Sequence, residues 1–252
     1  MQSVKFKKPP LKEVVFGVNI EISELSLVHF GLYWETIKEK FPTTIENFGG
    51  LTLTGDENYT PSFPAVWYLS SEENRLIRLT KDYFSYHCRC IKEDYQHFEN
   101  LFEEFLNEWN RLESWWLYFS QQQIKVKQYS LRYINIIDEN SNWRDLEDNS
   151  KVFSLFKQEI KTSLGLPETY LSEFRFELPD NFGELEISLE TSQQEVSGLK
   201  KNFMIFYLST FSKIMNGKFQ KYWFDSAHDF IIQSFLDLTT EEAQNLWERV
   251  YE

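Results

Sequence analysis

The centre of the sequence reads Gln128-Tyr129-Ser130-Leu131-Arg132-Tyr133-Ile134-Asn135-Ile136-Ile137, and the rest of the predicted fold is arranged around it. Apolar side chains occupy both of its alternating positions, whereas a strand with one wet face would be apolar at only one of them. Apolar residues at both positions are typical of a strand inside a sheet that is covered on both faces. We therefore predict a buried central strand over residues 128–137.

The residues before this strand predict one unit of mixed secondary structure. An alternating pattern predicts a strand over residues 14–22, and apolar residues spaced by three and four predict a helix over residues 30–41 that Pro42 ends. Turn-rich segments then separate a short strand at residues 51–53 from antiparallel hairpins over residues 65–90. A long helix follows.

The long helix carries the clearest pattern in the chain. Its stripe steps by four and three residues and consists of Phe98, Phe102, Phe105, Trp109, Leu112 and Trp116. This stripe predicts a helix laid on one face of the sheet, with Phe102, Phe105 and Trp109 deeply buried. Trp115 lies about 100° around the helix from the stripe. We therefore predict that Trp115 or Tyr118 stays partly exposed and contributes to a protein interface.

A similar order of elements recurs after the central strand. A polar loop leads to a predicted helix with Phe153, Phe156 and Ile160 inward. Strands are predicted over residues 174–178, 184–190 and 203–211. The next predicted helix covers residues 225–238, with Asp225 as its N-cap. The spacing of Thr239 and Glu242 predicts a capping box for a last short helix.

These elements predict an α+β fold of two similar halves. Each half, residues 1–125 and residues 126–252, reads strand, helix, antiparallel strands, helix, and the second half adds the last helix. We expect the halves to share a pseudo-twofold antiparallel sheet covered by helices and to form one compact unit. This order of elements resembles the topology of the TATA-binding-protein-like folds. The resemblance concerns topology alone and implies no function.

Several sequence pieces together resemble a sporadically distributed, uncharacterised prokaryotic protein family. The pieces are Pro9-Pro10-Leu11 with Glu13-Val14-Val15 and Phe16, His29 with Trp34-Glu35 and Phe41-Pro42, Tyr95 with Phe98 and Glu99, Leu131-Arg132-Tyr133 with Asn135 and Ile137, and Ala227-His228 with Phe235 and Trp247. The resemblance spans nearly the whole chain and depends on the order of the pieces. It implies a patchily inherited gene of an accessory locus, such as a mobile or defence locus. It implies no reaction, cofactor or catalytic residue.

Charge argues against nucleic acid as a partner. The 252 residues carry a net charge of −13, spread along the chain, and an acidic chain repels phosphate backbones. The only concentrated basic stretch contains Lys5, Lys7, Lys8 and Lys12. We interpret it as a solvated chain end.

The cysteines and the apolar pattern predict a cytoplasmic protein. Cys88 and Cys90 lie one residue apart and would point to the same side of a strand, where a disulfide is strained. Free thiols indicate a reducing compartment. No apolar run is long enough to cross a membrane, and no signal segment precedes the first strand, so we expect no membrane association.

Two patterns raise the question of catalysis. Asp225 and His228 are spaced by three residues, as a general base and its orienting carboxylate on one helix face would be; a capping Asp225 and a half-buried His228 explain the same pattern. His87 and Cys88 are adjacent in a predicted strand and point to opposite faces, so His87 cannot activate this thiol. Sequence motifs for zinc, for phosphate loops and for dinucleotides are missing, and we expect no metal and no cofactor.

Arg132 places a charge inside an otherwise apolar strand, and a buried charge needs a partner or a wet cavity. Two interpretations are open. Arg132 pairs with an acid on a covering helix, or it binds an anionic group in a pocket between the halves, with Asn135 as its neighbour.

Three functions remain open. The leading hypothesis is a non-catalytic binding or scaffold protein that acts through protein–protein contacts, as a homodimer or with a protein partner. It depends on the 8 tryptophans and 13 tyrosines, which are more than a core needs and are enriched at interfaces. The alternatives are a sensor of a small anionic ligand that uses Arg132 and Asn135, and a hydrolase that uses His228.

Overall fold

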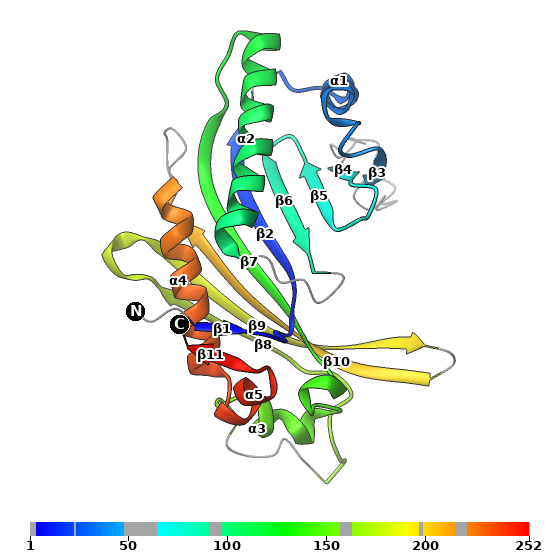
Figure 1. Cartoon of the computed structure of the whole chain (residues 1–252), viewed down its shortest axis with the longest axis vertical. Coiled ribbons are helices and arrows are strands. Elements are labelled where there is room, and N and C mark those ends of the chain that lie inside the picture. Colours follow the sequence, from blue (N-terminus) through cyan, green and yellow to red (C-terminus); the bar gives the residue numbers. More distant parts are fainter. Residues whose placement is uncertain are drawn as a thin grey trace, which may run out of the picture.

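Nine strands form one antiparallel sheet in the computed structural model of the chain (Figure 1), which describes residues 4–22, 24–47, 65–90, 97–156, 163–196, 199–214 and 221–251. In order across the sheet, the strands are β3 (Thr43–Asn47), β4 (Ala65–Leu69), β5 (Arg75–Leu79), β6 (Tyr83–Arg89), β2 (Leu11–Glu21), β7 (Lys125–Ile137), β10 (Leu199–Ser212), β9 (Gly183–Val196) and β8 (Leu171–Glu177). A separate antiparallel pair joins β1 (Val4–Phe6) to β11 (Arg249–Tyr251). The helices are α1 (Leu27–Ile37), α2 (Phe98–Ser120), α3 (Asn149–Val152), α4 (Lys221–Leu238) and α5 (Glu241–Leu246). The mixed α+β class is as predicted.

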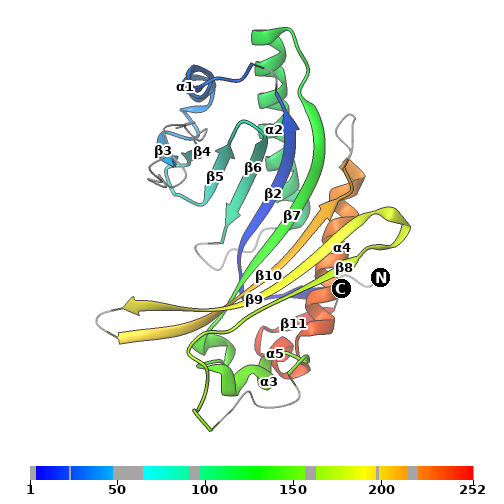
Figure 2. The same cartoon turned by 180° about the vertical axis from the view of Figure 1, so that it is seen from behind.

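β7 is a central strand, as the sequence predicts. It pairs with β2 along one edge and with β10 along the other, and Arg132 lies opposite Val15 and Ser209. The predicted cover on both faces is wrong: α2 and α4 lie over the same face (Figure 1), and among the described elements no helix covers the opposite face (Figure 2). The side chains of Ser130 and Arg132 point to the uncovered face of β7 together with that of Ile134. This face is therefore only half apolar, which is why it needs no helix over it.

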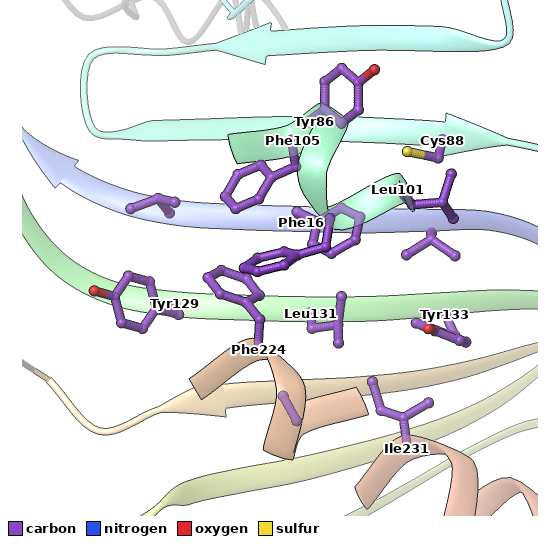
Figure 3. Packing of buried hydrophobic residues seen from close by; sticks show 14 of the residues in the cluster. Phe16, Tyr86, Cys88, Leu101, Phe105, Tyr129, Leu131, Tyr133, Phe224 and Ile231 are labelled. Carbon is purple, nitrogen blue, oxygen red and sulfur yellow. The ribbon is translucent and has the colours of Figure 1, made fainter. Parts of the chain in front are cut away.

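A cluster of aromatic rings around Phe16 of β2 holds the helices on the sheet (Figure 3). The Phe16 ring lies 5.0 Å from the ring of Phe105 in α2 and 6.0 Å from that of Phe224 in α4. The Phe224 ring also lies 5.3 Å from that of Tyr129 in β7. Buried aromatic side chains remove about 150–250 Å² each from water, so they dominate the energy of a core. A single residue of β2 thereby contacts both covering helices.

The burial predicted for α2 is confirmed. Phe102, Phe105 and Trp109 are each at most 2% exposed. The helix ends where Gln121 takes a left-handed conformation, with φ of 58°, and its backbone N–H donates to the carbonyl of Leu117 at 3.0 Å. The helix therefore extends four residues past the predicted stripe.

The predicted helix around residues 153–160 is wrong within the described residues. Its place is taken by the single turn α3, which ends at Val152, and Phe153 forms an isolated bridge with Thr239. Phe153 is nevertheless fully buried, so the pattern identified a core position and misassigned its backbone. Ile160, the predicted strand at residues 51–53 and Tyr95 lie outside the described residues.

Two predicted helix caps are also wrong. α4 begins at Lys221, so Asp225 lies inside the helix instead of capping it. α5 is capped by Thr240, whose hydroxyl accepts a hydrogen bond from the backbone N–H of Ala243 at 3.2 Å. The hydroxyl of Thr239 donates instead to the carbonyl of Phe235 in the preceding helix.

Among the described residues, no helix combines the length and the apolar character needed to span a membrane.

The two proposed halves share one sheet through the β2–β7 ladder. The helices that occupy corresponding places in the two halves differ in length, because α1 has 11 residues and α3 has four. The similarity of the halves therefore stays a prediction.

Replacement of Trp109 by alanine should lower the free energy of unfolding by about 3–5 kcal/mol, because it removes a completely buried indole ring. Urea denaturation of the purified chain measures this loss. The matched control is Asn107→Ala in the same helix: this side chain is exposed and lies outside the packed stripe, and its loss should change the free energy by less than about 0.5 kcal/mol. Equal losses for the two variants would contradict the described packing of α2.

Candidate functional site

Exposed apolar side chains gather where α1 begins and α2 ends. We call this region the end surface; its members are Leu27, Val28, Leu32, Leu117, Tyr118 and Phe119, each at least 41% exposed. The two helices meet here through His29, whose ring lies 4.9 Å from that of Phe119 and 5.4 Å from that of Trp116. Both helix ends lie at the same end of the molecule (Figure 1).

His29 fixes the geometry of the end surface. Its Nδ1 accepts a hydrogen bond from the backbone N–H of Ser26 at 2.8 Å, which is the role of the glutamate in an ordinary capping box. The same ring packs edge-on against Phe119 of α2. One side chain thus starts α1 and holds it against α2, so the exposed residues of the two helices keep a constant relative position.

The two predicted interface residues have different environments. Tyr118 is 85% exposed. Trp115 is partly buried: its ring stacks on that of Phe119 at 5.8 Å and lies 5.2 Å from that of Tyr33. Tyr118 is therefore available to a partner, whereas Trp115 supports the surface from beneath. Their role in an interface stays a prediction.

The end surface is free of charge in a highly charged chain. Residues 25–34 and 114–124 contain no Asp, Glu, Lys or Arg. The wider segments 21–40 and 108–127 carry five Lys and Arg against six Glu, a net charge of −1 compared with −13 for the whole chain. Electrostatic repulsion between acidic molecules is therefore weak at this end.

Gly31 lies within α1 between two members of the end surface, Val28 and Leu32. A Cβ atom built at Gly31 would meet no described atom within 4 Å, so neighbouring residues do not require a glycine here. Glycine inside a helix destabilises the fold by roughly 0.5–1 kcal/mol relative to alanine. A close approach of another molecule to the backbone of α1 would explain its presence.

Arg132 and Asn135, predicted to share a pocket, lie on opposite faces of β7. Arg132 is on the face without helices, where its Nε donates to the hydroxyl of Ser209 at 2.8 Å and its guanidinium lies 5.9 Å from the ring centre of Tyr207. Asn135 is 2% exposed beneath α4, and its side-chain amide donates to the carbonyl of Phe206 at 3.2 Å. The structure does not bring the two side chains together, because three residues along a strand reverse the direction of a side chain.

His228 is half-buried against the core, between α2 and β7. Its ring stacks on that of Phe98 at 4.2 Å, and Nδ1 lies 2.7 Å from the hydroxyl of Tyr133. Burial lowers the pKa of His228 to about 4, and the charges of Asp229 and Glu99 oppose this shift only in part. Asp225, the predicted orienting carboxylate, is exposed on α4.

The low pKa of His228 predicts a specific acid sensitivity. The folded chain binds the proton less tightly than the unfolded chain, whose His228 has a pKa of 6.5, so stability is fully present above pH 6.5 and falls as the pH drops toward 4. This group should contribute about 3 kcal/mol to the difference in stability between pH 7 and pH 4. His228→Phe keeps the aromatic packing and should remove that part of the pH dependence. Urea denaturation of both chains at several pH values measures it, and equal slopes would contradict the assignment.

A chain of polar contacts that the sequence analysis missed joins Glu13, His87 and Ser85 across β2 and β6. His87 Nδ1 lies 2.5 Å from a carboxylate oxygen of Glu13, and Nε2 lies 2.9 Å from the hydroxyl of Ser85. This is the order of groups in a hydrolytic triad. Ser85 is completely buried, however, so its hydroxyl cannot reach a substrate. The contacts satisfy polar groups of the sheet, and Cys88 points to the other face, as predicted.

Within the described part of the chain, no three His, Cys, Asp or Glu side chains are grouped as metal ligands. No protein-family model, curated protein or solved structure matches the chain. The resemblance to the prokaryotic family stays a prediction.

Proposed function

We propose that the chain is a non-catalytic binding protein that acts through protein–protein contacts, and that the end surface joins two copies of it. The observation that carries the proposal is an uncharged apolar surface, built from two helices, on a chain with a net charge of −13. Exposed apolar patches of this kind are typical of protein interfaces. The two histidines weighed for catalysis support a non-catalytic role, because the half-buried ring of His228 stacks on Phe98 and His87 contacts a buried serine.

A second copy of the chain is the partner that fits the end surface best. An isologous contact places the same patch on both sides, so two uncharged surfaces meet and the repelling acids stay outside the contact. Gly31 allows the α1 helices of the two copies to approach closely, with Val28 and Leu32 on either side. Tyr118 then supplies the large aromatic side chain that interface centres favour.

Three finer statements belong to this proposal. We infer a duplicated pair of halves from the order of elements, an accessory prokaryotic locus from the family resemblance, and a cytoplasmic location from the two free cysteines. Each is a separate prediction and none is needed for the dimer.

Size-exclusion chromatography with light scattering should show a dimer of the full chain at micromolar concentration. Tyr118→Ser should shift the chain toward the monomer without lowering the melting temperature of the monomer, because the side chain is 85% exposed. Tyr222→Ser is the matched control: Tyr222 is 64% exposed on α4, and its replacement should leave the dimer intact. A wild-type chain that stays monomeric over the whole concentration range would overturn the proposal.

Gly31→Ala separates folding from association. The added methyl group should stabilise the monomer by about 0.5–1 kcal/mol, because it removes the cost of a glycine inside a helix. It should also weaken the dimer, since it occupies the space that the second copy needs. Urea denaturation and light scattering measure the two effects on one sample. A variant that is more stable and associates as strongly as the wild type would show that nothing approaches α1 at Gly31.

A further inference from the structure

Two open clefts adjoin each other at the end of the molecule opposite the end surface. One has a volume of about 650 Å³ and lies between residues 7–12 and Trp247; the other, of about 540 Å³, lies between residues 138–144 and the start of β10. Ile136, Asp138 and Asn140 line both clefts, so the two adjoin along these residues, and we call them together the hollow.

Backbone hydrogen bonds between distant segments build the walls. Lys7 and Lys8 donate through their backbone N–H groups to the carbonyls of Glu248 and Trp247, at 3.2 and 3.1 Å. The N–H of Ile136 donates to the carbonyl of Pro10 at 2.9 Å. The indole of Trp247 also donates to the hydroxyl of Ser141 at 3.1 Å. Hydrogen bonds between segments distant in the sequence therefore hold the walls of the larger cleft together at several positions.

The lining of the hollow is strongly basic. Its cations are Lys7, Lys8, Lys12, Arg144, Lys200 and Lys201, and its acids are Asp138 and Glu139. Lys8 pairs with Glu248 at 2.5 Å, and Lys201 pairs with Glu139 at 2.6 Å. The four remaining cations form no ion pair within 4.0 Å with any described residue.

This distribution of charge is exceptional in the molecule. Outside the lining residues, the chain carries 20 Lys and Arg against 37 Asp and Glu. A concave site lined by one sign of charge concentrates the electric field and attracts ligands of the opposite sign. Unpaired lysines in such a site are compact donors for phosphate oxygens.

We propose that this hollow binds a compact ligand that carries several phosphate groups, a function separate from the protein–protein contact. Lys7 and Lys12 in the larger cleft, and Arg144 and Lys200 in the smaller one, supply the charge. Side-chain amides of Asn140, Asn202 and Gln194 add hydrogen-bond groups, and the half-buried Phe203 offers an apolar surface to an organic part of the ligand.

The acidic remainder of the chain limits the size of the ligand. A long nucleic acid would leave the basic hollow and run over surface that is negative, where each phosphate is repelled within a Debye length of about 8 Å. A nucleotide or a short inorganic polyphosphate stays inside the hollow. The ligand class is therefore the small polyphosphate, whether inorganic or attached to a nucleoside.

Isothermal titration of the full chain with inorganic tripolyphosphate and with ATP, at constant ionic strength, tests the proposal. We expect saturable binding of at least one probe, matched by a rise in melting temperature. Lys12→Gln/Lys200→Gln removes two exposed cations and should weaken binding on the order of tenfold or more. The control Lys81→Gln/Lys125→Gln changes the net charge equally at distant sites and should leave the affinity unchanged.

Tighter binding of ATP than of tripolyphosphate would identify a nucleotide as the ligand, and the reverse would identify an inorganic polyphosphate. Either result supports the site if only the cleft variant loses affinity. Absence of binding by both probes would overturn the proposal, as would equal losses in the two double variants. Tighter binding of a single-stranded oligonucleotide than of ATP would overturn the restriction to compact ligands.

Discussion

The ring of Phe16 packs against both covering helices and so joins α2 and α4 to one strand of the sheet. β2, which carries Phe16, is hydrogen-bonded to β6 on one side and to β7 on the other. The ring contacts Phe105 of α2 and Phe224 of α4, so both helices are anchored above the same strand. The Phe224 ring also lies 5.3 Å from that of Phe102 and 5.2 Å from that of Phe105, so the two helices pack against each other as well as on β2.

The placement of the helices on one face determines what the other face must contain. Polar side chains there satisfy one another: Tyr83 bonds to Ser130 at 3.2 Å, and Asn19 donates to Gln128 at 2.9 Å. The Tyr83–Ser130 contact crosses above Gly17, where a Cβ atom would lie 2.2 Å from each hydroxyl oxygen. A larger residue at position 17 would have to displace these hydroxyl groups, so glycine in the middle of β2, on the face opposite Phe16, preserves their contact.

Local periodicity predicted those elements whose boundaries depend on local sequence. The hairpins of β4, β5 and β6 and the buried stripe of α2 follow from turn residues and from spacing. The start of α4 was missed because packing decides it: Trp223 and Phe224 are buried ahead of Asp225 and extend the helix past a good capping residue. A residue pattern on one strand also could not show that helices would cover only one face of the sheet.

Some features of the candidate sites also follow from local sequence, and others depend on contacts that only the fold creates. The exposure of Tyr118 follows from its angle on one helix, whereas the contribution of α1 to the end surface depends on a contact between α1 and α2. The contact of His87 with Glu13 could be predicted only from the register of β2 against β6, because the two residues lie 74 positions apart in the sequence. The basic stretch near residue 8 was visible in the sequence, but its neighbours Arg144 and Lys200 are brought close only by the fold.

The pairing of β1 with β11 makes the basic hollow depend on contacts between two segments that lie far apart in the sequence. Residues 7–12 form one wall of the larger cleft, and the wall that faces them contains Leu246 and Trp247. An interrupted or proteolytically shortened chain that lacks residues 246–251 can still pair β2 with β6 and β7, but it cannot close this hollow. Loss of the β1–β11 pair would therefore open the hollow without breaking the nine-stranded sheet, to which neither strand belongs.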